Sequence, residues 1–149
     1  MESVHGGDVI IELDPDDCAD LLASAPVGWL AVIVDGHPEV FPVNHVYDGD
    51  SGCVAFPSNT GTKLHAALGP AEVAFGADGV SDDASRGWSV VVLGRAVEVT
   101  EATTIARLEL GRDRLWRTGE AVRWVRIVPS KMTGRRICGA EHAVEIVTD

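Results

Sequence analysis

The chain is organised around Phe56-Pro57-Ser58-Asn59-Thr60-Gly61-Thr62-Lys63-Leu64-His65-Ala66-Ala67-Leu68. An apolar run from Cys53 to Phe56 gives way to hydroxyl, amide and glycine residues, then to a short helical pattern that Gly69-Pro70 ends. This order predicts a strand, a loop and a helix. The free N–H groups at the start of such a helix, with the hydroxyls of Ser58, Thr60 and Thr62, suit an oxyanion.

Lys63 strengthens this interpretation. Met1 to Ser85 contains fifteen Asp and Glu residues and a single cation, Lys63. A lone ammonium on a Ser/Thr/Gly turn, in a half of the chain that otherwise repels anions, favours a phosphate clamp. A solvated lysine at a helix start is the alternative. The Gly-Thr-Lys pattern lacks the earlier glycine and the Gly-Lys pair of a P-loop.

Composition limits the class of protein. The 149 residues carry a formal net charge of -11 and 46% hydrophobic residues, as expected for one globular domain. A surface this acidic disfavours nucleic acid and anionic membranes as partners. The acidic N-terminus does not resemble a secretory signal, and the longest uncharged run, Leu21 to Val34, is too short for a membrane helix. We therefore expect a soluble, cytoplasmic protein, in which three widely spaced cysteines are buried thiols.

The remaining pattern predicts a mostly β protein. Asp14-Pro15 opens a helix, Asp35-Gly36 turns a hairpin, and Gly94 inside a long strand indicates a bulge. Pro42 in the return strand of the hairpin predicts a bulge or a sheet edge. About six strands and three short helices indicate an antiparallel barrel in a single domain, residues 1–149, with a tail over 1–13 and a C-terminal extension over 138–149. Within these ends, we expect strands at Val9 to Leu13 and Ala143 to Val147.

The order of these motifs resembles a known family. The motifs are Ala25-Pro26-Val27-Gly28, Phe41-Pro42-Val43-Asn44, Gly61-Thr62-Lys63-Leu64, Gly87-Trp88-Ser89-Val90-Val91-Val92-Leu93-Gly94, Trp124-Val125-Arg126-Ile127 and Thr133-Gly134-Arg135-Arg136-Ile137. Together they resemble the actinobacterial pyridoxamine 5′-phosphate oxidase-like proteins, which are FMN-binding split barrels. The likeness runs from about Asp14 to Ile137.

The resemblance implies a homodimer with an FMN at each subunit interface. The strand over Phe41 to Val46 would run alongside the flavin ring, and Ser58 to Leu64 would hold the phosphate. The implied cofactor-binding residues are Pro42, Val43, Asn44, His45, Phe56, Ser58, Thr60, Thr62, Lys63, Leu64 and Trp88. Asn44 and His45 alternate along a strand, so one of them is expected to face the ring. A packed histidine and a barrel-packing Trp88 are the alternatives for those two residues.

One departure leaves three functions open. Relatives of this kind usually carry an arginine where this chain has Pro57, so a phosphate cation is missing. The first hypothesis is an FMN-dependent oxidoreductase acting on a small molecule. The second is a reductase that uses the deazaflavin F420, and the third is a degenerate barrel that binds or regulates without a cofactor. No catalytic acid–base pair and no metal-ligand spacing is recognisable, and the C-terminal pattern of true pyridoxamine phosphate oxidases is absent.

Overall fold

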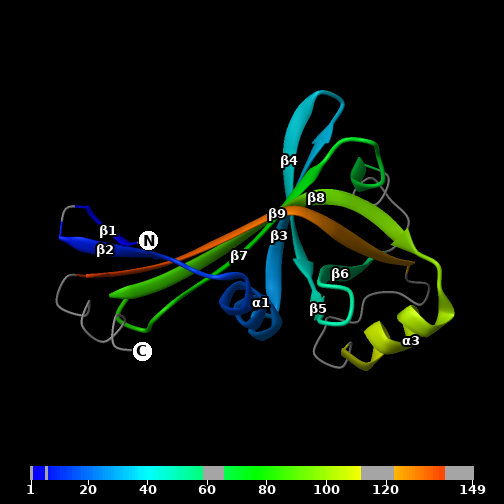
Figure 1. Ribbon diagram of the computed structural model, residues 1–149. Helices are drawn as coiled ribbons and strands as arrows, with labels where there is room; N and C mark the ends of the chain where they lie inside the picture. The colour runs from blue at the N-terminus through cyan, green and yellow to red at the C-terminus, as the bar shows by residue number, and fades with distance from the viewer. Residues whose placement is uncertain (1, 6, 59–65, 112–122, 140–149) are drawn as a thin grey trace.

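The computed structural model describes residues 2–5, 7–58, 66–111 and 123–139. It is an antiparallel β structure with two helices among these residues (Figure 1). The elements are β1 (Glu2–His5), β2 (Asp8–Glu12), α1 (Pro15–Ser24), β3 (Val27–Val34), β4 (His37–Asn44), β5 (Val46–Asp48), β6 (Cys53–Ser58), β7 (Val73–Val80), β8 (Arg86–Val99), α3 (Ala102–Leu110) and β9 (Arg123–Gly139). Neither described helix has the length and apolar character that a membrane span requires.

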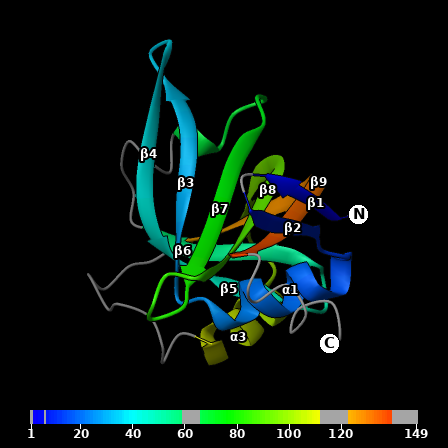
Figure 2. The same cartoon turned by 90° about the vertical axis from the view of Figure 1, so that its left-hand side faces the viewer.

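Strand β9 holds the two parts of the sheet together. The strand order is β1-β2-β9-β8-β7-β3-β4, and β6, with β5 beside it, pairs with the other half of β9. β8 accompanies β9 along its length, whereas β2 pairs with its C-terminal end and β6 with its N-terminal end. Figure 1 shows β8 and β9 crossing the molecule, and Figure 2 shows the β3–β4 hairpin projecting from it. The sheet is therefore curved, and β4 and β5 are edge strands of its two parts.

Gly94 allows β8 to bend. The β8–β9 register shifts between Leu93 and Gly94, which confirms the predicted bulge. A Cβ at Gly94 would lie 2.1 Å from the carbonyl oxygen of Val128, so the two backbones meet at a distance that leaves room for glycine alone.

The start of α1 follows the capping prediction. Asp14 accepts a 2.8 Å hydrogen bond from the backbone N–H of Asp17, and Pro15 begins the helix. Cys18 and Leu22 are the buried residues of this helix, and they join the core of the barrel. That core also contains the fully buried Phe56 and Phe75.

A second apolar cluster places α3. Leu108 of α3 packs with Ala55, Val99 and Trp124, and Trp124 Nε1 donates a 3.0 Å hydrogen bond to a carboxylate oxygen of Glu109. The helix begins after Glu101, whose side chain makes no capping hydrogen bond. α1 thus packs on the main core and α3 packs on the second cluster, and neither helix covers the projecting β3–β4 hairpin (Figure 1).

The fold class is confirmed, and the strand pattern is richer than expected. Nine strands are described where about six were predicted, because residues 1–13 contain a hairpin, β1–β2, and β5 is a separate short strand. Residues 123–139 form one long strand, which joins the two motifs Trp124-Val125-Arg126-Ile127 and Thr133-Gly134-Arg135-Arg136-Ile137. The predicted strand at Ala143 to Val147 lies outside the described residues. Most of the predicted helix before Gly69-Pro70 also lies outside them, and its described residues Ala66 and Ala67 are helical.

Candidate functional site

The register defines an outer face of the sheet that carries exposed apolar side chains. Directly paired residues of antiparallel strands share a face. Trp29 pairs with Pro42 and Gly76, Gly76 pairs with Val91, and Val91 pairs with Thr133, so these five residues form one row on the outer face. Core residues such as Val90 and Val92 lie on the opposite, inner face.

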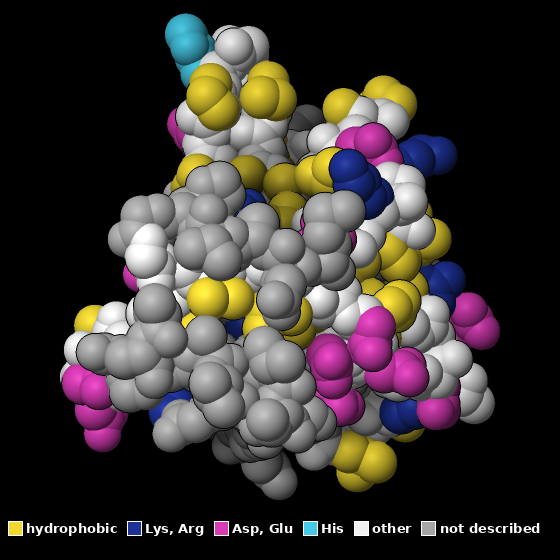
Figure 3. Space-filling view, turned by 60° about the vertical axis from the view of Figure 1, so that its left-hand side comes forward, with side chains coloured by type: hydrophobic (Ala, Val, Ile, Leu, Met, Phe, Trp, Pro, Cys, Tyr) yellow, Lys and Arg dark blue, Asp and Glu magenta, His cyan; other side chains and the backbone are white. Residues whose placement is uncertain are grey.

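This outer face stays exposed where a folded monomer would normally bury apolar residues. Trp29 is 48% exposed and Val91 is 40% exposed, and on the hairpin Ile33 and Val40 are 60% and 57% exposed. Figure 3 shows hydrophobic side chains gathered near the tip of this hairpin. A contiguous exposed apolar surface of this kind marks a contact site for another molecule.

A cavity of about 640 Å³ opens on the outer face at β2, β8 and β9. Ser89 pairs with Arg135, and Arg135 pairs with Glu12, so the three side chains share the face that the cavity occupies. The cavity is lined by Ile10, Glu12, Leu13, Ser89, Val91, Met132, Thr133, Gly134 and Arg135. This mixed lining, with apolar side chains, two hydroxyls, a guanidinium and the Glu12 carboxylate, suits a flat organic ligand that carries polar groups.

Asn44 and His45 both face the end of α1. Asn44 Nδ2 donates to the carbonyl oxygen of Pro26 at 3.1 Å, and His45 Nε2 lies 2.8 Å from that of Leu22. A carbonyl can only accept, so His45 Nε2 carries the proton. Both residues are buried, because β4 ends at Asn44 and the strand alternation stops there. Both side chains therefore bond to backbone carbonyls at or just after the C-terminal end of α1. The strand alternation had instead predicted that one of the two residues faces the flavin ring.

The other implied residues of β4 and β6 divide between core and surface. Val43 and Phe56 are buried in the core, so their side chains face away from any ligand on the outer face. Pro42 is exposed on the outer face opposite Trp29, and β4 is a sheet edge, as its proline predicted. Ser58 ends β6 and is buried.

The predicted phosphate segment begins directly after Ser58. Thr60, Thr62, Lys63 and Leu64 lie outside the described residues. Arg123 of β9 is opposite Ser58, but its guanidinium is bonded to Glu98, where it lowers the pKa of that carboxyl. Among the described residues, Arg123 is therefore not free to replace the arginine expected at the position of Pro57.

Trp88 lies on the inner face. It pairs with Gly79 and Arg136, one residue out of step with the Ser89–Arg135 pair of the outer face. The structure thus separates Trp88 from the outer cavity, and its indole packs partly against the core.

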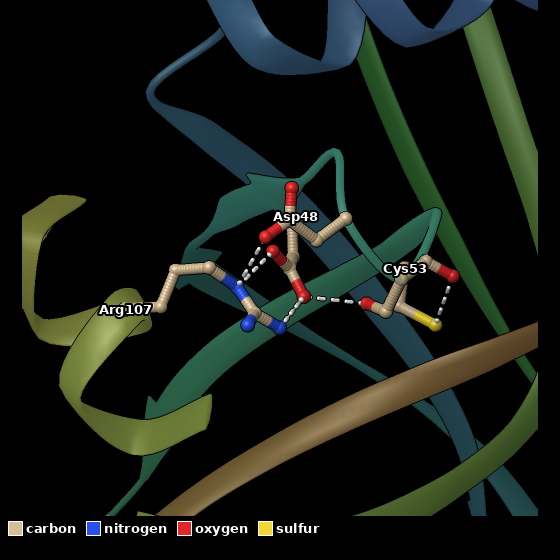
Figure 4. A network of polar contacts seen from close by, with 5 residues as sticks. Asp48, Cys53 and Arg107 are labelled. Carbon is tan, nitrogen blue, oxygen red and sulfur yellow. Dashed lines mark hydrogen bonds and ion pairs between the residues drawn. The ribbon is translucent and has the colours of Figure 1, made fainter. Parts of the chain in front are cut away.

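An ion pair fixes α3 beside β5 (Figure 4). The Arg107 guanidinium donates from Nε and Nη2 to the two carboxylate oxygens of Asp48, each at 2.8 Å, and Ser51 Oγ donates to the same carboxylate at 2.5 Å. The hydrogen bonds from Arg107 hold the pKa of Asp48 below its ordinary value. Elsewhere, the described residues contain no group of three or more His, Cys, Asp or Glu side chains placed to hold a metal ion.

Three residues of the outer cavity were missed as site residues from the sequence: Ser89, Thr133 and Arg135. The segment Thr133-Gly134-Arg135-Arg136 was part of a motif of the family resemblance, with no face assigned to its side chains. It is extended strand, and its alternation places Arg135 on the outer face and Arg136 on the inner face. The hydroxyl and guanidinium groups of these residues are visible in the sequence, but the strand register is needed to show that they share one face of the sheet.

Comparison with known proteins gives a consistent result. The family model described as pyridoxamine 5′-phosphate oxidase matches residues 14–136. The structure of the FAD binding protein from Mycobacterium smegmatis is 33% identical, with a TM-score of 0.74 over 86% of this chain and 98% of that one. A putative pyridoxamine 5′-phosphate oxidase from Corynebacterium glutamicum is 28% identical, with a TM-score of 0.74 over 91% and 97%. A FAD-binding protein from Mesorhizobium loti is 25% identical, with a TM-score of 0.71 over 88% and 98%.

Proposed function

The chain belongs to the pyridoxamine 5′-phosphate oxidase-like family, and from this premise we propose that it binds a flavin and works as a flavin-dependent oxidoreductase on a small molecule. The observation that carries the proposal is the outer-face cavity of about 640 Å³, next to exposed Trp29 and Val91. The flavin-binding names of two similar structures support the same cofactor class.

The residues around the cavity fit a flavin. The cavity volume lies in the range of about 300–1,000 Å³ that small-molecule sites occupy. Val91 offers apolar surface for a fused ring, and the Ser89 and Thr133 hydroxyls can bond to its polar edge. The Arg135 guanidinium can pair with a carbonyl edge or a phosphate.

We propose that two copies of the chain meet through the outer face. Trp29 and Val91 lie in the middle of this face, and Ile33 and Val40 lie on the projecting hairpin. Covering these apolar side chains with a second copy removes them from water, which favours association. A two-fold dimer is the simplest closed arrangement of one such face on itself.

The dimer also explains how two distant parts of one chain would serve one flavin. Arg123, opposite the end of β6, and Thr133 in the cavity are ten residues apart on β9, which corresponds to roughly 30 Å of strand. That separation exceeds the length of a flavin mononucleotide. In a two-fold dimer, the cavity of one protomer would receive the ring, and the segment after Ser58 of its partner, with Lys63, would receive the phosphate.

The flavin would supply the hydride transfer, and the chain would bind and orient the reactants. Ser89, Thr133 and Arg135 would hold the ring, and the apolar outer faces would exclude water from it. The described cavity carries Glu12 as its acidic group, and Arg135 is its cross-strand neighbour. Small, electron-poor or quinone-like molecules are the substrate class that needs no further acid–base machinery.

The direct test is a titration of the purified protein with FMN, FAD and riboflavin, followed by visible absorbance and gel filtration. We expect a flavin to remain with the protein, and Arg135→Gln to weaken its binding about tenfold. Lys131→Gln, an exposed residue of the same strand outside the cavity, serves as the matched control. Lys63→Ala should weaken FMN but leave riboflavin unchanged, because riboflavin has no phosphate.

Because Pro57 replaces an expected arginine, the deazaflavin F420 is tested as a second cofactor. Pro57 lies on β6 opposite Trp124, and it stands where the family resemblance leads us to expect an arginine. Tighter binding of F420 than of FMN in a parallel titration would support the alternative function, a deazaflavin-dependent reductase. A protein that binds neither cofactor at high micromolar concentration would contradict the proposal and favour a cofactor-free binding or regulatory role.

A further inference from the structure

A second cavity, of about 510 Å³, lies against the inner face at the far end of the sheet. It is bordered by the first turn of α1, by β2, and by the paired ends of β7, β8 and β9, which lie together on the left of Figure 1. Its lining includes Glu12, Asp17, Gly79, Arg86, Trp88 and Arg136. This cavity and the outer-face cavity lie on opposite faces of the sheet and share two lining residues at its edge, Glu12 and Leu13.

The indole of Trp88 is fixed in the wall of the cavity by a glycine. Gly79 pairs with Trp88, and a Cβ built at Gly79 would lie 2.5 Å from the indole Nε1 and 2.9 Å from Cε2. A larger residue at position 79 would therefore displace the ring. The close approach leaves the indole resting on the strand backbone beside the open volume, where a flat ligand can stack on it.

The side chains that share the indole's face are basic. Arg136 pairs directly with Trp88, and Arg86 lies two residues before Trp88 on the same strand, so both belong to the inner face. Glu12 pairs with Arg135 and therefore belongs to the outer face, although it reaches the rim. Asp17 of α1 is the acidic group that remains on the inner side among the described lining residues.

Arg136 is half-buried and has no ion-pair or hydrogen-bond partner for its guanidinium among the described residues. An unpaired guanidinium that water still reaches at the wall of a cavity is available to an anion, and its planar fork matches a carboxylate or a phosphate. An indole wall and a neighbouring guanidinium together recognise a flat ring that carries a negative charge.

We infer that this inner cavity binds a small molecule with a flat aromatic ring and an anionic group, the ring stacking on Trp88 and the anion pairing with Arg136. The site goes beyond the proposed flavin site and does not depend on it. An aromatic carboxylic acid and a purine nucleotide both have the required chemistry.

The test follows the side-chain N–H signals of the four tryptophans of the ¹⁵N-labelled, full-length protein by NMR. Trp88→Phe identifies the Trp88 signal by its loss. We expect benzoate or AMP to shift that signal saturably, with benzamide and adenosine as their uncharged counterparts. A response to AMP alone assigns a nucleotide, and a response to benzoate alone assigns an aromatic acid. Arg136→Gln should weaken binding of the anion about tenfold, and Lys131→Gln should not change it.

Three results would overturn the inference. The first is an unmoved Trp88 signal with both anions at about 10 mM, which excludes even weak binding. The second is equal binding of the charged and uncharged compounds, and the third is unchanged binding in Arg136→Gln. Unshifted signals of Trp29 and Trp124 show that each variant remains folded. Gly79→Val provides an independent check, since displacing the indole should abolish binding while Arg136 is retained.

Discussion

Arg107 and Asp48 are joined by two parallel hydrogen bonds of 2.8 Å between α3 and the end of β5. The carboxylate of Asp48 is 5% exposed, whereas the Arg107 side chain is 37% exposed. The pair is therefore a bidentate contact with one buried partner and one partner that water still reaches. Arg107 is 59 residues from Asp48 in the sequence, so the contact ties two distant parts of the barrel together.

Asp48→Asn is expected to lower the free energy of unfolding at pH 7 by about 1 kcal/mol, because the guanidinium loses its charged acceptor in a half-exposed setting. The pKa of Asp48 in the folded protein is held below its ordinary value of 3.8. The stabilisation is thus complete above that value and is lost as the pH falls through the folded-state pKa. Urea denaturation from pH 7 to pH 3 should show the wild type and the variant converging at the acidic end.

Asp50→Asn is the matched control for this pair. Asp50 lies 3.5 Å from Arg107 Nε, but its side chain is exposed, so its removal should change stability little at any pH. A constant difference between wild type and Asp48→Asn across the whole pH range would contradict the charge-based account and indicate a packing effect.

Asn44→Ala should cost about 1–2 kcal/mol of stability, because the Pro26 carbonyl loses a donor in a largely buried place. Its effect on the FMN dissociation constant should stay within about a factor of two, since the amide is directed to the backbone. Thermal unfolding and flavin titration on the same variant separate the two roles. Ser24→Ala, which removes an exposed hydrogen bond to Leu21 at the same helix end, provides the comparison. If stability were unchanged and FMN affinity fell tenfold, Asn44 would instead be a cofactor-binding residue.

Gly94→Ala should destabilise the protein by about 2–3 kcal/mol, since the added methyl group would meet the Val128 carbonyl at the bulge. The clash is with backbone, which cannot move aside as a flexible side chain can. Gly49→Ala, where no atom lies within 4 Å of the added Cβ, should stay within about 0.5 kcal/mol of wild type. Equal midpoints of the two variants in chemical denaturation would show that β8 bends without needing a glycine.

Much of the fold could be predicted because its signals are local. Asp35 and Gly36 have φ angles of 51° and 79°, as the tight hairpin turn predicted from this pair requires. The Asp14 cap and the Gly94 bulge likewise depend on neighbouring residues in the chain or on one backbone contact. The expected strand at Val9 to Leu13 is β2 (Asp8–Glu12). β1 (Glu2–His5) was missed, because its four residues contain one apolar side chain and therefore little local strand pattern.

The site was harder to predict for the same reason. Ser89 and Arg135 come together only through the β8–β9 register, and the neighbouring pair, Trp88 and Arg136, lies on the opposite face of the sheet. Trp88 was therefore named for its residue type and then found on the inner face. His45 was an ambiguous prediction, because the sequence does not show that a helix carbonyl, that of Leu22, lies beside it.

Trp29→Glu should abolish the proposed dimer. Trp29 is 48% exposed in the middle of the outer face, so a carboxylate there would have to be buried without a partner when two faces meet. Sedimentation velocity should show wild type as a dimer and the variant as a monomer, and the variant should also lose flavin, because each flavin site would need both protomers. Leu110→Glu, at an 82% exposed position at the end of α3, should change neither property. A wild-type monomer at high protein concentration, or a Trp29→Glu dimer that retains flavin, would show that the outer face serves another partner.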